Sequence, residues 1–146
     1  MANGFYEHGA KHWARGNFKW LFDATPTSAE DDAFRVALVD TADYTVNLAT
    51  HEFRDAAGLA AGIEETSGLM TLVDGALDGI IDASDVVLLT TAGDQCEGIL
   101  VYQDEGSAAA DRLFLWWDTG VGGMPVTLGG DVTIAWSNGA DKIAKL

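Results

Sequence analysis

The chain has 146 residues, 48% of them hydrophobic, which fits a single domain with a substantial core. Its 23 acidic residues outnumber its 8 lysines and arginines and give a formal net charge of −15, so we expect no direct binding to the phosphates of nucleic acid. No apolar run is long enough to span a membrane and the N-terminus lacks the pattern of a secretory signal, so we expect no membrane attachment.

Charge is distributed unevenly along the chain. The interval from Arg54 to Arg112 contains no other lysine or arginine, whereas it holds twelve acidic residues. Lys11, Arg15 and Lys19 instead lie close together near the N-terminus. We therefore expect an acidic body, either solvated or facing a basic partner, with a mildly basic and aromatic N-terminal end.

The first element that the pattern predicts is a short helix over residues 5–16. Phe5, His8 and His12 fall near one face of such a helix, although Gly9 lowers its intrinsic stability. We interpret residues 1–16 as an N-terminal aromatic and basic arm or helix, and residues 17–146 as a single β-sandwich domain.

Two strands and a second short helix are predicted next. Alternation of side chains predicts strands over residues 18–24 (FKWLFDA) and 33–41 (AFRVALVDT), joined by a polar loop. Residues 50–58 predict a short helix with Thr50 as its N-cap.

The rest of the chain consists of short apolar runs separated by glycine and aspartate, a spacing typical of β sandwiches. These runs cover residues 68–73, 85–91, 96–104, 111–118, 124–130, 131–139 and 141–146. Neighbours on a strand point to opposite faces, so we expect Trp116 and Trp117 to face different sides. The fold class that we predict is all-β, an antiparallel β sandwich of immunoglobulin-like or jelly-roll-like type with a short N-terminal helix.

Asp118, Thr119 and Gly120 follow a predicted strand, as the catalytic Asp-Thr-Gly of aspartic proteases does. Aspartic proteolysis needs two carboxylates that share a proton, so a chain with one such motif would act only as a symmetric dimer. Val121 stands where those proteases carry a small Ala or Ser, and Asp, Thr and Gly are common turn formers. We predict a turn with no catalytic residue, and keep a dimeric protease using Asp118 as the remote alternative.

Two groups of residues have some features of metal sites. His8 and His12 have the spacing of a helical metal pair, but HGAKH lacks the glutamate of the zinc-protease motif and supplies no third ligand. Four aspartates lie close together without the rhythm of a calcium loop, and their Asp-Gly steps favour a hairpin. They are Asp74, Asp78, Asp82 and Asp85. We predict no metal and no cofactor, and whether a divalent ion lies among these aspartates stays open.

Cys96 is the only cysteine in the chain. It excludes an internal disulfide and fits assembly in a reducing cytosol. Because it lies in an apolar run, we predict a small core residue rather than a nucleophile.

Several phrases of the sequence occur together and in a fixed order. They are FRVALVDTADYTVNLATHEF, DASDVVLLTTAGDQCEGILVYQDEGSAAADRLFLWWDTG and PVTLGGDVTIAWSNGADKIAKL, which cover most of residues 34–146. In this order they resemble small β-rich virion structural proteins of tailed bacteriophages, of the capsid decoration (cement) or neck and tail accessory type. The chain departs from that group in LAAGIEETSGLM and in FLWW.

The resemblance implies a non-enzymatic structural role in the virion, which is assembled in the host cytoplasm. We expect a decoration protein that binds and stabilises the outer surface of the head as a homo-oligomer, with the major capsid protein as its partner. The alternative is a neck, collar or tail accessory protein that binds neck or tail proteins. The expected partner-binding residues are the aromatic and basic ones near the N-terminus, Phe5, Tyr6, His8, His12, Trp13, Arg15 and Trp20.

Overall fold

The computed structural model describes residues 3–15, 33–73, 80–118, 124–137 and 143–145. Its main feature is an antiparallel sheet of five strands in the order β1-β8-β7-β2-β3. These strands are β1 (Gly4–Phe5), β2 (Phe34–Val39), β3 (Ile63–Thr66), β7 (Gly98–Gln103) and β8 (Leu113–Trp117). Strands β2 and β7 pair along their whole length and form the centre of the sheet.

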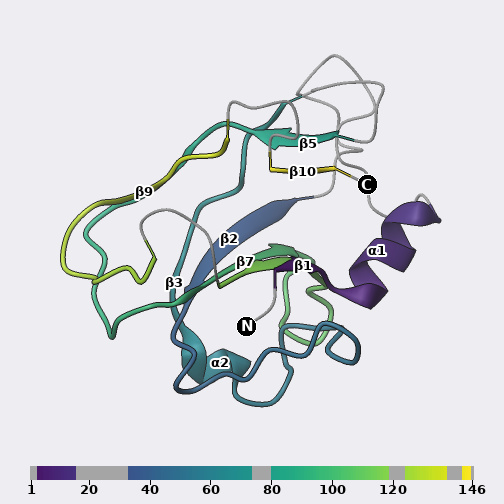
Figure 1. The fold of residues 1–146 in the computed structure, drawn as a ribbon, viewed down its shortest axis with the longest axis horizontal. Helices are drawn as coiled ribbons and strands as arrows, with labels where there is room; N and C mark the ends of the chain where they lie inside the picture. The colour runs from purple at the N-terminus through teal and green to yellow at the C-terminus, as the bar shows by residue number, and fades with distance from the viewer. Residues whose placement is uncertain (1–2, 16–32, 74–79, 119–123, 138–142, 146) are drawn as a thin grey trace.

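A second β layer lies over one face of this central sheet. It consists of a small sheet in the order β10-β5-β4 and a two-stranded ribbon of β6 and β9. The bounds are β4 (Leu72–Val73), β5 (Ile80–Ala83), β6 (Val86–Leu88), β9 (Val132–Ile134) and β10 (Ala144–Lys145). Figure 1 places β5, β10 and β9 on one side of the central sheet, and α2 (Leu59–Gly62) with its flanking loops on the other. The predicted all-β, sandwich-like class with antiparallel sheets is confirmed.

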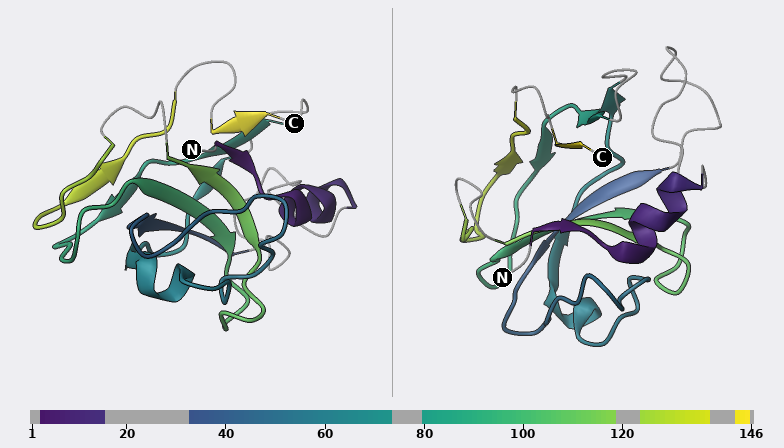
Figure 2. Two further views of the ribbon diagram at one scale, coloured as in Figure 1. Left: turned by 60° about the horizontal axis from the view of Figure 1, so that its bottom comes forward. Right: turned by 45° about the vertical axis from the view of Figure 1, so that its right-hand side comes forward.

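The central sheet is covered on both faces because its middle strands are apolar at almost every position. Phe34, Val36 and Leu38 of β2 pack toward the second β layer, in a cluster that we call the inter-sheet core. Ala37 and Val39 pack on the opposite face, in a cluster that we call the loop-side core. Figure 2 shows the resulting three layers, with the central sheet between the second β layer and the loops around α2.

The adjacent tryptophans of β8 point to opposite faces, as predicted. Trp116 is fully buried in the loop-side core, where Gly98 leaves room for its indole: an added Cβ would lie 2.2 Å from the ring. Trp117 packs against the inter-sheet core, and its ring centre lies 5.9 Å from that of Trp136.

Helix α1 (Glu7–Ala14) follows β1 directly and packs on β8. The backbone N–H of Tyr6 donates to the carbonyl oxygen of Phe114 at 2.9 Å. A Cβ added to Gly9 would lie 2.5 Å from the carbonyl oxygen of Leu113, so this close approach requires glycine. The predicted N-terminal helix is confirmed, and the glycine that weakens it in isolation is the residue that lets it pack.

The predicted helix over residues 50–58 is wrong. This segment forms turns and an isolated bridge between Phe53 and Arg112. The N–H of Arg54 donates to the carbonyl oxygen of Asp111 in a distant loop at 2.9 Å, and the N–H of Ala56 closes only a single turn onto the carbonyl oxygen of Phe53 at 3.0 Å. Tertiary hydrogen bonds therefore override the local capping signal.

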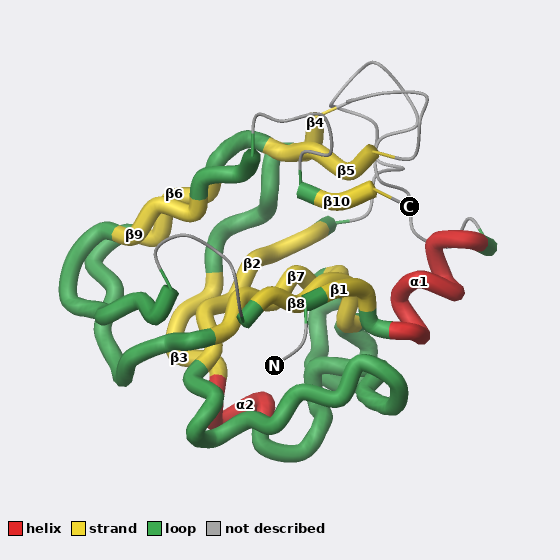
Figure 3. The backbone as a smooth tube through the Cα atoms, viewed as in Figure 1, coloured by secondary structure: helices red, strands yellow, loops and turns green. Residues whose placement is uncertain are grey.

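Other predicted strands are shorter than expected or lie outside the described residues, as Figure 3 shows for the strands in yellow. Residues 124–130 contribute only a bridge between Val126 and Cys96. Strands β4 and β5 pair in antiparallel fashion, in agreement with the predicted hairpin, although its connecting residues 74–79 are outside the described part. The predicted strand over residues 18–24 is also outside it. Neither helix in the described parts of the chain has the length and apolar character needed to cross a membrane.

Candidate functional site

Helix α1 and two loops bring two histidines, a carboxylate and a guanidinium together. His8 and His12 lie one turn apart on α1, and Glu52 and Arg112 come from loops that meet at the Phe53 bridge. Glu52 Oε1 accepts a hydrogen bond from Arg112 Nη1 at 2.9 Å. The Glu52 oxygens also lie 3.4 Å from His8 Nδ1 and 3.7 Å from His12 Nε2. We call His8, His12, Glu52 and Arg112 the α1 cluster.

The environment of His12 favours its neutral form. Burial lowers the pKa of His12 below its ordinary value of 6.5, and the charge of Arg112 acts in the same direction against the attraction of Glu52. Arg112 Nη1 donates to His12 Nε2 at 3.0 Å, so the lone pair of that nitrogen is engaged. His12 is therefore not placed to take a proton from a substrate through Nε2.

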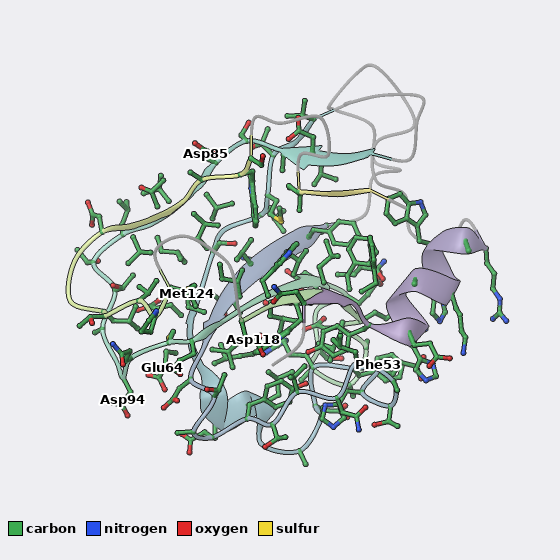
Figure 4. The ribbon with its side chains drawn as sticks, viewed as in Figure 1. Phe53, Glu64, Asp85, Asp94, Asp118 and Met124 are labelled. Atoms are coloured by element: carbon green, nitrogen blue, oxygen red, sulfur yellow. The ribbon has the colours of Figure 1, made fainter. Side chains whose placement is uncertain are left out.

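A pocket of about 480 Å³ opens beside the α1 cluster. Its lining residues are His12, Phe53, Gln103, Glu105, Ala109, Ala110 and Arg112. The Arg112 guanidinium carbon lies 4.8 Å from the centre of the Phe53 ring, and Gln103 Nε2 donates to Glu105 Oε1 at 2.5 Å. Figure 4 labels Phe53 next to the start of α1. Within this wall Arg112 pairs with Glu52, and Glu105 accepts its hydrogen bond from the neutral amide of Gln103.

The structure corrects the assignment of Tyr6 as a partner-binding residue. Tyr6 has no exposed surface, and its ring belongs to the loop-side core. Its hydroxyl lies 3.1 Å from the hydroxyl of Tyr44, which in turn lies 2.8 Å from His51 Nδ1. Burial raises the pKa of both tyrosines. Tyr6 therefore ties the N-terminal segment to the loop after β2 and is not available to a partner.

Phe5 and Trp13 are partly buried, and their side chains pack against the inter-sheet core. Their ring centres lie 5.5 Å and 5.4 Å from that of Phe114, which is fully buried. The same segment is part of the central sheet, because β1 pairs with β8 and the N–H of Glu7 donates to the carbonyl oxygen of Leu48 at 2.7 Å. The structure thus places residues 4–15 against the body of the fold.

The solvent side of α1 carries the basic residues that the sequence predicts, together with the exposed Glu7. Lys11 and Arg15 are exposed, and the His8 side chain is 37% exposed. Lys11 Nζ pairs with Glu7 Oε1 at 2.5 Å, one turn earlier. We call His8, Lys11 and Arg15 the α1 outer face. Trp20, the last predicted contact residue, lies outside the described residues.

Asp118 follows β8 directly, near the middle of the view in Figure 4. Its N–H donates to Asn3 Oδ1 at 2.7 Å. It lines a pocket of about 350 Å³ together with Glu97, whose carboxylate accepts hydrogen bonds from the N–H and hydroxyl of Thr41 at 3.1 Å and 3.2 Å. Residues 119–120 lie outside the described part, so the predicted turn and the protease alternative both stay predictions.

The candidate metal ligands do not assemble within the part of the chain that the structure describes. No group of three His, Cys, Asp or Glu side chains suited to a metal ion occurs there. Asp82 accepts a hydrogen bond from the next backbone N–H at 2.9 Å, and Asp85 accepts one from the N–H of Trp136 at 3.0 Å. Asp74 and Asp78 lie outside the described residues.

Cys96 is a core residue, as predicted. It is fully buried in the inter-sheet core. Burial, reinforced by nearby carboxylates such as Glu64 and Glu97, raises the pKa of its thiol to about 12. The thiolate, which is the nucleophilic form, is therefore suppressed near neutral pH.

Comparisons of the chain with protein-family models, with curated proteins and with solved structures found no match. Sequence reasoning identified His8 and His12 of the α1 cluster but missed Glu52 and Arg112. These two come from loops far from α1 in the chain, and no spacing rule connects them. The available signal was that Arg112 ends a long interval without other basic residues, since a lone guanidinium in an acidic stretch tends to find an internal carboxylate.

Proposed function

We propose that this protein is a non-enzymatic structural protein of a tailed-bacteriophage virion, and that it is a capsid decoration protein on the outer surface of the head. The observation that carries the proposal is where the resembling phrases fall in the fold. VALVDT falls on β2, DASDVV on the end of β5 and on β6, and ILVYQD on β7. The later phrases fall on β8, β9 and β10 in the same order. The resemblance therefore involves the strands that build both layers, rather than one loop.

The α1 outer face is the contact surface that we assign to this function. Arg15 and Lys11 are exposed there on a molecule whose formal net charge is −15. A local basic patch on an acidic body orients the molecule toward an acidic partner surface and raises the rate of encounter. The partner is the major capsid protein, and placement on a symmetric shell favours a homo-oligomer. The protein then resides in the virion after assembly in the host cytoplasm.

The first test is the copy number of the protein in purified virions, measured against the major capsid protein by quantitative mass spectrometry. A fixed simple ratio to the capsid subunit is the expected result. A low copy number set by a portal or tail ring would assign the protein to the neck or tail instead. Absence from the particle would refute the virion role, and the protease alternative would then be tested by asking whether Asp118→Asn abolishes a peptidase activity at acid pH.

The second test addresses the α1 outer face. Arg15→Glu should weaken binding to phage heads assembled without this protein, whereas the parent chain binds fully. The whole chain is used because removal of residues 1–16 would delete β1 and the buried Tyr6. Equal binding by Arg15→Glu and the parent chain would show that the α1 outer face is not the contact surface.

A further inference from the structure

The ribbon of β6 and β9 has one covered face and one open face. Val86 and Leu88 are buried in the inter-sheet core, whereas Val87 and Leu89 are 53% and 68% exposed. Strand pairing and alternation place six exposed residues on the outward side, which we call the ribbon face. They are Asp85, Val87 and Leu89 from β6 and the residues next to its ends, and Asp131, Thr133 and Ala135 from β9 and the residues next to its ends. Figure 3 shows the two strands side by side, far from α1.

The sequence of β6 is that of a strand covered on both sides. A continuous apolar run is typical of such strands, whereas a strand with one face in water usually alternates apolar and polar residues. This chain follows the rule in β2 and β7, which are buried on both faces. The run Val86–Leu89 breaks the rule, because only its inward half is covered. Single exposed apolar residues are ordinary, but Val87 and Leu89 lie two residues apart on one face, and apolar side chains grouped on one face are a feature of contact surfaces.

Each end of the ribbon face carries an aspartate held by the opposite strand. Asp85 Oδ1 accepts a hydrogen bond from the N–H of Trp136 at 3.0 Å, just beyond the end of β9. Asp131 Oδ1 accepts one from the N–H of Thr90 at 2.9 Å, just beyond the end of β6. Figure 4 labels Asp85 at the end of the ribbon nearest β5. The ribbon face is therefore an apolar strip with a fixed negative charge at each end.

We propose that the ribbon face docks an extended segment of a partner protein whose apolar centre is flanked on both sides by lysine or arginine. Charge complementarity argues for this occupant over a second copy of the chain. Because both ends of the strip are acidic, two copies placed face to face would oppose aspartate to aspartate in either orientation, on molecules that each carry a formal net charge of −15.

This inference rests on the proposed decoration function and deepens it. Helix α1 and the ribbon of β6 and β9, which carry the two faces, lie at opposite ends of the longest axis in Figure 1, and they are also far apart in Figure 2. A protein that stabilises a shell by bridging subunits needs two separated contact surfaces. The ribbon face supplies the second, so that one copy reaches two neighbouring capsid subunits.

The test uses the full chain and a synthetic peptide of alternating valine and threonine with two lysines at each end. Val87→Thr combined with Leu89→Thr should weaken peptide binding about tenfold, measured by titration in NMR. The matched control is Leu69→Thr, because Leu69 is 58% exposed and lies between β3 and β4, outside the ribbon. This control should leave the affinity unchanged.

A second pair of variants tests the charges. Asp85→Asn combined with Asp131→Asn keeps an oxygen that can accept the same backbone hydrogen bonds but removes both charges. This variant should bind the peptide more weakly, and its affinity should depend less on salt. Asp43→Asn combined with Asp55→Asn removes two exposed charges elsewhere and is the control.

The outcomes separate this inference from the proposed function. Absence of peptide binding to the parent chain at millimolar concentration, or equal binding by the Val87→Thr, Leu89→Thr variant, overturns the inference. A dimer in sedimentation that this variant abolishes also overturns it, in favour of a second copy. If phage heads assembled without the protein bind parent and variant equally, decoration stands and the ribbon face is refuted. If the heads bind neither, decoration fails, and the peptide titration still decides the ribbon face.

Discussion

The α1 end and the ribbon end of the molecule use their side chains in opposite ways. At the α1 end, Phe5 and Trp13 pack on Phe114, and the α1 cluster pairs its charges internally. At the ribbon end, Val87 and Leu89 point into solvent between two aspartates. At the α1 end most aromatic rings and charges have partners within the fold, whereas at the ribbon end the apolar side chains of Val87 and Leu89 remain exposed.

This difference shows that composition alone does not tell which side chains of a segment are buried and which are exposed. Aromatic and basic residues near the N-terminus predict a docking arm, yet Tyr6 is fully buried and Arg112 holds His12 by a hydrogen bond. A four-residue apolar run predicts a core strand, yet half of it is exposed. The two ends differ in whether other parts of the chain cover their side chains, and this depends on tertiary contacts.

The largest expected effect follows from removing the ring on which the α1 end is built. Phe114 is fully buried, and the β7–β8 register shifts beside it, so its ring meets Phe5, Trp13 and Phe34. Phe114→Ala should lower the free energy of unfolding by about 3–5 kcal/mol, because it leaves a cavity in a packed aromatic group. Urea denaturation measures this loss. A loss below about 1 kcal/mol would mean that the α1 end is no better packed than a surface site.

The next effect concerns the close approach of α1 to β8. Gly9→Ala should destabilise the protein by roughly 1–3 kcal/mol, because the new methyl meets the backbone of Leu113 and Phe114, which cannot move aside without shifting β8. The helix-propensity gain of about 1 kcal/mol is too small to reverse the sign. Gly68→Ala is the matched control, since nothing lies within 4 Å of its added Cβ. A stabilised Gly9→Ala protein would show that α1 is loosely attached.

The fold class could be predicted from the sequence because its signals are local. The alternation within AFRVALVDT and DVTIAWS specifies which side chains face the inter-sheet core, and β2 and β9 follow it. Strand β3 could not be found, because IEET has no β pattern of its own and becomes a strand only by pairing with β2. The helix expected over residues 50–58 failed for the same reason, since Asp111 supplies its backbone partner.

The candidate site was predicted only in part. The helical spacing of His8 and His12 is visible in the sequence and is confirmed in α1. Their partners Glu52 and Arg112 depend on loops that meet only in the folded chain. Local patterns could not predict the burial of Tyr6 either, because Tyr44, whose hydroxyl lies 3.1 Å from that of Tyr6, is thirty-eight residues away in the chain.

A smaller effect, at the α1 end, is the pH dependence of stability that His12 causes. The pKa of His12 is lowered in the folded protein below the value of 6.5 expected when unfolded. Between these two pKa values the unfolded chain binds more protons, so this contribution to stability is present above pH 6.5 and is lost as the pH falls toward the folded pKa. Stability measured by urea denaturation should therefore decline on acidification through this window. In His12→Gln the decline of stability with falling pH should be smaller, whereas in His8→Gln it should be the same as in the parent. If His12→Gln and the parent show the same pH dependence of stability, burial and Arg112 do not lower the pKa of His12.

The smallest expected effect is at the ribbon end. Val87→Thr and Leu89→Thr should each change the free energy of unfolding by less than about 0.5 kcal/mol, because neither side chain contributes to the inter-sheet core and threonine is well suited to a strand. Urea denaturation of each variant beside Leu69→Thr provides the measurement. A loss above about 1 kcal/mol would mean that these side chains already pack within the molecule, which would undo the contrast with the α1 end. Unchanged stability instead means that the run Val86–Leu89 is more apolar than folding requires, which is what the proposed docking of a partner segment on the ribbon face predicts.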